Sequence, residues 1–170
     1  MGRRGISVEA AKSAVRRSNT TIAALMVHLG DADAMLCGLV GRFDNHLDHV
    51  RDVIGIKKGA TGLATLNALM LEKRTLFIAD TNISEFPTAQ EMADIAIEAA
   101  RAVKSLGFEP RVAFLSYSTF GQPDGERAQK LREAVKILDR HQGIDFEYDG
   151  EMSAEVALEL SDAALLRKWT

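Results

Sequence analysis

Small hydroxyl residues and a glycine gather where an apolar strand is expected to pass into a helix. Ser116, Ser118, Thr119 and Gly121 lie within "LSYSTFGQ", at the end of the apolar run Val112–Leu115. Ligands of open α/β sheets bind beyond the carboxyl ends of strands, where hydroxyls and N–H groups before a helix suit a phosphate or pyrophosphate. The same residue types also stabilise ordinary turns. The stretch therefore indicates either a ligand cradle or a simple turn.

Other candidate sites have weaker signals. Arg42, on the turn "GLVGRF", is a candidate anion contact, although the two glycines of that turn fall short of a dinucleotide fingerprint. The segment "DGE", Asp149–Glu151, is either a turn or a pair of carboxylates at a second strand end. The four histidines lack metal-ligand spacing, so we expect no metal site. Cys37 lies in an apolar run, where a free cysteine usually behaves as a small hydrophobe.

Composition excludes several classes of function. The 170-residue chain has a formal net charge of −3, and without a long basic block it is not expected to bind nucleic acid. Its single cysteine fits a reducing compartment, and no apolar run reaches the roughly 18 to 20 residues that cross a bilayer. We therefore expect a cytoplasmic protein with no membrane partner.

Apolar runs alternate with stretches of helical period, which is typical of layered α/β folds. We predict a three-layer α/β/α arrangement with a mostly parallel sheet. The segment Leu63–Leu71 is ambiguous, because its Leu, Ala and Met residues favour a helix while the following Thr75–Ala79 is strand-like. A hairpin through Glu72–Arg74 is one solution. The expected strands are Ile22–Leu29, Met35–Val40, Leu76–Ala79, Val112–Leu115 and Phe146–Tyr148.

Capping residues predict the helices that separate these strands. Ser7 and Asp44 are plausible N-caps, and Thr88 with Glu91 forms a capping box after a proline. Glycines at 55 and 107 are expected to end two of the helices. The expected helices cover residues 7–18, 44–55, 88–107 and about 126–140.

Longer motifs carry a family resemblance. "FEPRVAFLSYSTFG", a helix and then "FEYDGEMSAEVAL" resemble the phosphate acetyltransferase/phosphate butyryltransferase family, in which an "LSxSTxG" strand and loop precede a helix and a "DGE" segment. "TLFIADTNISEFPTAQEMADIAIEAA" is similar to the segment upstream. The resemblance extends from about residue 21 to 158. It implies the phosphotransacetylase fold, which is isocitrate/isopropylmalate dehydrogenase-like, a hairpin at Leu63–Leu71, and a homo-oligomer.

Within that family, the chain is most similar to the C-terminal domain of hybrid, NADP-dependent malic enzymes. The similarity rests on "ALMVHLGDADAMLCGLVGRFDNHLDHVRDVIGIKKG" and "DGEMSAEVAL". It implies a regulatory domain that senses acetyl-CoA, in a parent enzyme that oxidatively decarboxylates malate to pyruvate with NADP and Mg²⁺ or Mn²⁺. The alternative is part of a phosphate acetyl- or butyryltransferase, which moves an acyl group between CoA and phosphate.

Departures from the family pattern shape these expectations. The family has a Ser-Thr pair where "LVGRFDNHLDHVR" follows Cys37-Gly38, and it often has lysine and serine where Phe120 and Gln122 stand. The family's C-terminal catalytic segments would lie beyond Thr170. We therefore expect residues 1–170 to form one domain, a fragment without catalytic residues or a cofactor of its own. Apolar faces left uncovered in such a fragment favour association.

Overall fold

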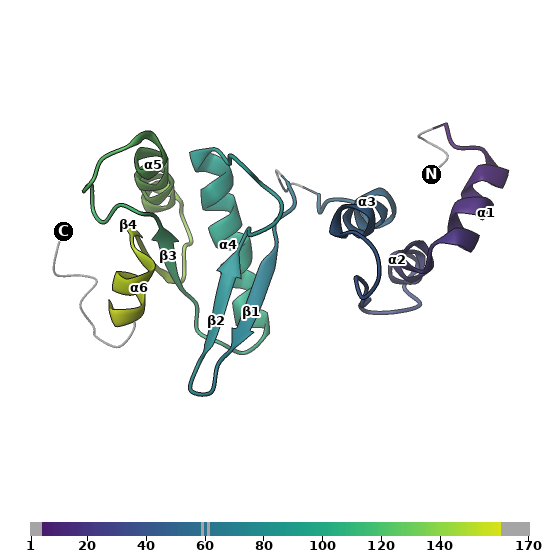
Figure 1. The fold of residues 1–170 in the computed structure, drawn as a ribbon, viewed down its shortest axis with the longest axis horizontal. Coiled ribbons are helices and arrows are strands. Elements are labelled where there is room, and N and C mark those ends of the chain that lie inside the picture. Colours follow the sequence, from purple (N-terminus) through teal and green to yellow (C-terminus); the bar gives the residue numbers. More distant parts are fainter. Residues whose placement is uncertain (1–4, 59, 61, 161–170) are drawn as a thin grey trace. The chain divides into compact units, whose positions relative to one another are not determined.

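The computed structural model describes residues 5–58, 60 and 62–160, and the chain divides into two compact units, residues 1–60 and 61–170 (Figure 1). The first unit is helical, and the second contains all of the described strands. In chain order the elements are α1 (Val8–Arg17), α2 (Asn19–Leu29), α3 (Phe43–Val53), β1 (Leu66–Met70), β2 (Thr75–Ala79), α4 (Ala89–Ser105), β3 (Arg111–Leu115), α5 (Glu126–Arg140), β4 (Glu147–Met152) and α6 (Ala154–Leu160).

Serine caps define the first two helices. The Ser7 hydroxyl accepts a hydrogen bond from the backbone N–H of Ala10 at 3.2 Å, as the sequence predicts for the start of α1. Ser18 ends α1 and also caps α2, because its hydroxyl accepts from the N–H of Thr21 at 3.1 Å. α3 begins two residues earlier than expected, with Arg42 rather than Asp44 at the N-cap position.

Histidines of α3 pack against threonines of α2. The Thr20 hydroxyl lies 2.8 Å from Nδ1 of His46, and the Thr21 hydroxyl lies 3.1 Å from Nδ1 of His49. Nε2 of His46 lies 2.9 Å from the carbonyl oxygen of Val40. Because that carbonyl only accepts, Nε2 carries the hydrogen and Nδ1 of the neutral ring accepts from Thr20. His46 and His49 therefore act as packing residues that join α3 to α2.

Two of the expected strands are wrong. Ile22–Leu29 belongs to α2, where the Ser18 cap and a left-handed Gly30 at the C-cap (φ 82°) define a helix. Its Leu, Ala and Met residues favour that conformation, whereas an apolar run of this length has no period that separates strand from helix. Met35–Val40 is irregular, and within the described residues it pairs with no strand. A strand exists only through the backbone partners that complete its ladder.

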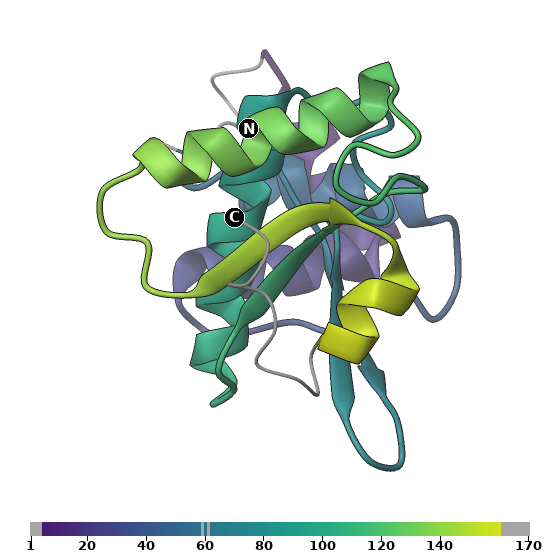
Figure 2. The same cartoon turned by 90° about the vertical axis from the view of Figure 1, so that its left-hand side faces the viewer.

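The second unit contains a hairpin and a parallel pair. β1 and β2 pair antiparallel, with Leu66 opposite Ala79 and Met70 opposite Thr75, which confirms the hairpin and the strand expected at 76–79. β3 and β4 run in the same direction, with Arg111 opposite Glu147 (Figure 2). The strands expected at 112–115 and 146–148 are therefore present, although β4 begins at residue 147 and continues to 152.

Alanines bring the helices of the second unit together. α4 and α5 pack on each other, α5 also packs on β3 and β4, and α4 and α6 lie on opposite sides of β3 (Figure 1). The buried cluster consists of Ala89, Ala93, Ala96, Phe114, Ala134 and Leu138. The chain thus has the expected α/β class, with one antiparallel and one parallel strand pair among the described residues.

Candidate functional site

The loop that follows β3 folds against the end of β4. The N–H of Ser116 donates to the carbonyl oxygen of Met152 at 2.9 Å. Further along, the N–H of Ser118 donates to the Ser116 hydroxyl at 3.1 Å, and Thr119 and Gln122 exchange backbone hydrogen bonds of 3.1 and 3.2 Å. The loop 116–122 is therefore held by its own hydrogen bonds and by the sheet.

Glu151 lies at the centre of this loop. Its Oε1 accepts three hydrogen bonds of 2.8 Å each, from the Ser118 hydroxyl, the N–H of Gly121 and Nη1 of Arg132. Its backbone carbonyl accepts a fourth from the N–H of Phe120 at 2.9 Å. Glu151 and Ser118 are both 0% exposed. A carboxylate removed from water is tolerated only with such partners, so the loop and Glu151 stabilise each other.

Left-handed backbone makes this geometry possible. Phe120 has φ 47° and Gly121 has φ 91°. Both residues donate their N–H to Glu151. The N–H of Phe120 bonds the backbone carbonyl of Glu151, and the N–H of Gly121 bonds its carboxylate oxygen Oε1.

Arg132 joins two carboxylates. It forms ion pairs with the buried Glu151 and with the more exposed Asp124. Burial alone would raise the pKa of Glu151, but the hydrogen bonds from Ser118 and Gly121 and the nearby guanidinium hold it below its ordinary value of 4.5. Hydrogen bonds from Arg132 and Gln129 likewise lower the pKa of Asp124. With all three groups ionised, two negative charges face one positive charge.

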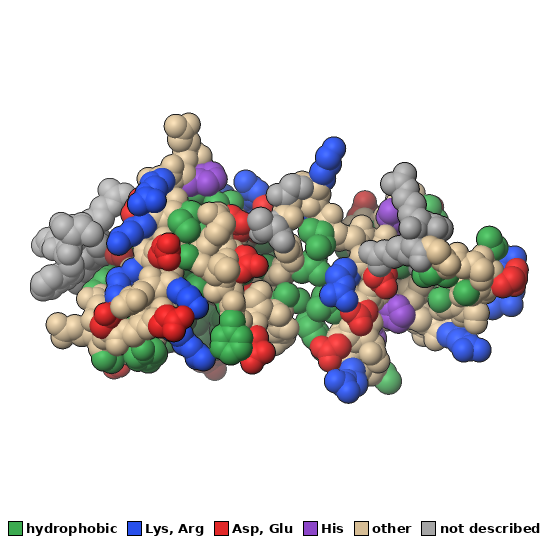
Figure 3. Space-filling view, turned by 90° about the horizontal axis from the view of Figure 1, so that it is seen from above, with side chains coloured by type: hydrophobic (Ala, Val, Ile, Leu, Met, Phe, Trp, Pro, Cys, Tyr) green, Lys and Arg blue, Asp and Glu red, His purple; other side chains and the backbone are tan. Residues whose placement is uncertain are grey.

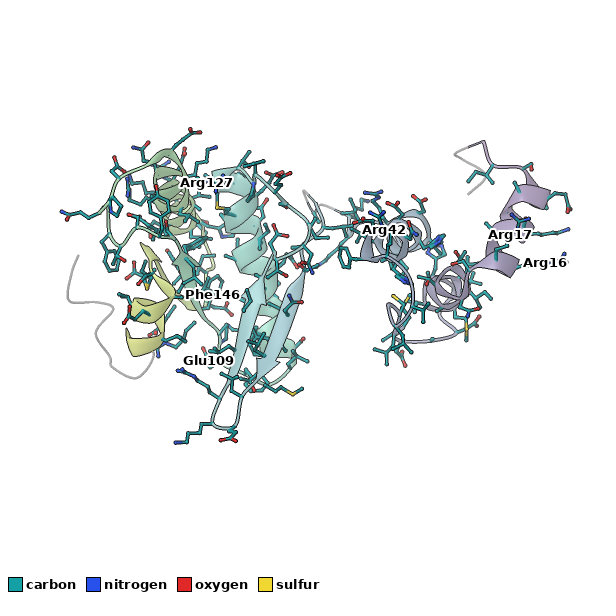
Figure 4. The ribbon with its side chains drawn as sticks, viewed as in Figure 1. Arg16, Arg17, Arg42, Glu109, Arg127 and Phe146 are labelled. Carbon is teal, nitrogen blue, oxygen red and sulfur yellow. The ribbon has the colours of Figure 1, made fainter. Side chains whose placement is uncertain are left out.

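The helix start beyond the loop has no side-chain cap. Gly125 occupies the N-cap position of α5 without a capping hydrogen bond. A β-carbon at residue 125 would meet the hydroxyl of Tyr117, so that exposed side chain would have to move aside. The Arg127 guanidinium, labelled in Figure 4, lies 5.6 Å from the centre of the Phe86 ring, which precedes α4. The starts of α4 and α5 are therefore neighbours.

The structure brings four of the five sequence-predicted site residues together. Ser116, Ser118, Thr119 and Gly121 share the loop 116–122. The Thr119 hydroxyl accepts from the N–H of Ser153 at 3.2 Å, which leaves its own hydrogen free to donate. Arg42 belongs to the other unit, where it is exposed and pairs with Asp44 at 3.2 Å (Figure 4).

Sequence reasoning missed the roles of Glu151 and Arg132. Glu151 was open to interpretation as a turn residue or a strand-end carboxylate, and Arg132 was simply part of a helix. A usable signal exists, because the carboxyl ends of adjacent parallel strands meet at one edge of a sheet. Residues that follow β3 and residues that end β4 should therefore be neighbours.

Surface charge and clusters of metal-ligating side chains give little further information about the site. On the face shown in Figure 3, basic and acidic side chains are interspersed. No three or more His, Cys, Asp or Glu side chains form a metal-binding group within residues 5–58, 60 and 62–160. Across the same part of the chain, every helix is too short or too polar to span a bilayer.

The chain is similar in sequence to malic enzymes and to phosphate acetyltransferases. Over 156 residues it is 48% identical to an NADP-dependent malic enzyme of Rhizobium meliloti, covering 92% of this chain and 20% of that protein. It is 41% identical over 158 residues to an NADP-dependent malic enzyme of Escherichia coli, with 93% and 21% covered. A phosphate acetyltransferase of Nitratidesulfovibrio vulgaris is 30% identical over 161 residues, with 95% and 23% covered. The chain thus spans about a fifth of the length of these relatives.

Fold comparison agrees. A phosphotransacetylase from Streptococcus pyogenes has a TM-score of 0.82 at 28% identity, over 99% of this chain and 51% of that chain. Residues 1–167 match the family described as phosphate acetyl/butaryl transferase. The resemblance carried by "LSYSTFG" and "DGEMSAEVAL" is thereby confirmed, and the chain belongs to the phosphate acetyl/butaryl transferase family.

Proposed function

We propose that the chain is part of a regulatory, acetyl-CoA-sensing domain of an NADP-dependent malic enzyme. The observation that carries this proposal is the 48% identity to such an enzyme over 92% of the chain, against 30% for a phosphate acetyltransferase. In this proposal malate is oxidatively decarboxylated to pyruvate elsewhere in the parent, which holds NADP and Mg²⁺ or Mn²⁺. The present residues contribute effector binding and no catalysis.

The strand-end loop is the proposed contact for a phosphate-bearing part of the effector. The Ser118 hydroxyl and the N–H of Gly121 already donate to Glu151, so their part is to shape the loop. The hydroxyls of Ser116 and Thr119 retain hydrogens to donate, and the uncapped first turn of α5 offers backbone N–H groups. Arg42 is a further proposed contact in the intact protein.

Location and assembly are part of the same proposal. We expect a cytoplasmic homo-oligomer that has neither nucleic acid nor membrane as a partner. Large apolar side chains between α2 and α3 support association, since Leu36 is 100% exposed and Leu39 is 98% exposed. Contiguous exposed apolar residues of this kind are usually covered by a partner surface.

Loop variants in the full-length protein test the sensing role. Malate oxidation is measured with NADP over a range of acetyl-CoA concentrations, for wild type and for Ser118→Ala with Thr119→Ala. We expect a weaker response to acetyl-CoA with an unchanged KM for malate. Ser105→Ala, on the exposed side of α4, is the matched control. An unchanged response in a folded double variant contradicts the proposal.

A second candidate, acyl transfer between CoA and phosphate, is favoured by the phosphotransacetylase fold match. Formation of acetyl phosphate from acetyl-CoA and phosphate by the full-length protein would support it. Malate oxidation without that activity would support the malic enzyme.

A further inference from the structure

The base of the β1–β2 hairpin brings together two polar residues. Thr65 immediately precedes β1 and Asp80 immediately follows β2, and antiparallel pairing makes them neighbours. The N–H of Asp80 donates to the carbonyl oxygen of Thr65 at 2.7 Å. The two side chains therefore lie at the same end of the hairpin.

Three side-chain oxygens at this place are buried without a hydrogen-bond partner. They are Oγ1 of Thr65 and both carboxylate oxygens of Asp80, and no donor reaches them from the part of the chain that the structure describes. Glu151 differs, because only its Oε2 is unpartnered among the described residues, while its Oε1 has three donors, one of them the Arg132 guanidinium. Buried carboxylates in proteins are normally paired with a cation or coordinate a metal, because their desolvation is costly.

The polar side chains next to these oxygens form their hydrogen bonds with each other. Nδ2 of Asn67 donates to the Thr81 hydroxyl at 2.6 Å, directly beside Asp80. Asp80 itself has φ 51°, a conformation that aspartate tolerates better than most residues. The polar groups on either side are therefore engaged with each other, while the Asp80 carboxylate and the Thr65 hydroxyl are not.

We propose that Thr65 and Asp80 bind a hard cation, coordinated by the Asp80 carboxylate and the Thr65 hydroxyl. Both contribute oxygen ligands, which suit Mg²⁺, Ca²⁺ or Na⁺ and not the thiolate- or imidazole-preferring metals. A single carboxylate is sufficient for such an ion, since Mg²⁺ typically keeps several waters and takes only one or two carboxylates. The bound charge offsets that of Asp80.

The position gives this cation an electrostatic effect beyond the hairpin. β2 and β3 point toward the same edge of the second unit (Figure 1), so the site lies at the edge from which the loop 116–122 also emerges. Glu151, Asp124 and Arg132 together carry an excess negative charge there. A cation at Asp80 makes that edge less repulsive to an anion.

Cation titration of the full-length protein tests the site. The melting temperature and the heat of binding are measured with MgCl₂, CaCl₂ and NaCl, and with tetramethylammonium chloride at the same ionic strength. Tetramethylammonium carries the charge but cannot accept oxygen ligands. We expect one coordinating cation to raise the melting temperature above the tetramethylammonium baseline, and its identity distinguishes a divalent from a monovalent site.

Variants assign the effect to these residues and separate it from any other metal site in the parent. Asp80→Asn is expected to weaken binding of the stabilising cation at least tenfold, and Thr65→Val is expected to weaken that binding less. Glu109→Gln removes an exposed carboxylate before β3 (Figure 4) and should respond as wild type does. The inference is overturned if wild type responds to no cation beyond tetramethylammonium, or if Asp80→Asn and Thr65→Val respond as wild type. Thr65→Val decides the matter alone if Asp80→Asn does not fold.

Discussion

Ser118 donates its hydroxyl hydrogen to Oε1 of Glu151 at 2.8 Å, although 33 positions separate the two residues in the chain. Both side chains are fully buried. The contact ties the loop after β3 to the end of β4, and it directs the serine inward, toward the protein, where sequence reasoning expected it to face a ligand. Whatever binds at this edge meets a loop whose shape depends on an internal carboxylate.

Ser118→Ala is expected to destabilise the second unit. The substitution removes one of three donors from a buried carboxylate oxygen, and hydrogen bonds to charged groups contribute about 1.5 to 3 kcal/mol each. Urea unfolding of wild type and variant measures the loss. Ser105→Ala, whose hydroxyl bonds an exposed helix carbonyl, should change the free energy of unfolding by less.

Arg132→Met should destabilise the protein more than Ser118→Ala does. The variant keeps the aliphatic contact of the side chain but leaves Glu151 buried without its cation, which is the costly case for an ion pair. It also removes the ion pair between Arg132 and Asp124. Urea unfolding again measures the effect, and a loss no larger than that of Ser118→Ala would show that Arg132 serves mainly Asp124.

Acid should reduce the stability that Glu151 contributes. Burial opposes ionisation, but Ser118, Gly121 and Arg132 hold the folded pKa below 4.5, so the unfolded chain takes up the proton first as pH falls. The contribution is therefore present at neutral pH and is lost as pH falls through the folded pKa. Glu151→Gln lacks it, so the stability gap between wild type and Glu151→Gln should narrow from pH 7 to about pH 3. Unfolding measured across this range would refute the account if the gap stayed constant.

Gly150→Ala should prevent the correct placement of Glu151. Gly150 has φ 145°, and a β-carbon there would lie 2.8 Å from both Cβ and the carbonyl oxygen of Phe114. The clash lies in the core and directly precedes the buried carboxylate. We expect a large drop in melting temperature, whereas Gly62→Ala, which meets nothing within 4 Å, should melt close to wild type.

Helices with polar caps could be predicted from the sequence. The capping box of Thr88 with Glu91 is present as expected, and α5 has the expected bounds. α2 was mistaken for a strand because its apolar residues surround the helix and leave no polar face to reveal the period. Met35–Val40 was mistaken for a strand because composition reports a preference for extended backbone and not the presence of a partner strand.

The candidate site was predicted in part. Four of its residues followed from the hydroxyls after β3, since loop chemistry is local in sequence. The direction in which each hydroxyl points depends on Glu151 and Arg132, which come from β4 and α5 and approach only when the parallel pair forms. Local sequence patterns do not predict contacts between residues so far apart in the chain. The one guide is the rule that adjacent parallel strands end at the same edge of a sheet.

The alanines packed between α4 and α5 set the distance between these two helices and also form part of the core. Ala93 and Ala134 are both 0% exposed, and each side chain extends by one carbon only. The two helix axes can therefore approach closely, and their amino-terminal ends, each with a partial positive charge, flank the same edge. A larger residue at either alanine would push α4 and α5 apart, so the separation of these two ends is set by methyl groups one or more helical turns away from them.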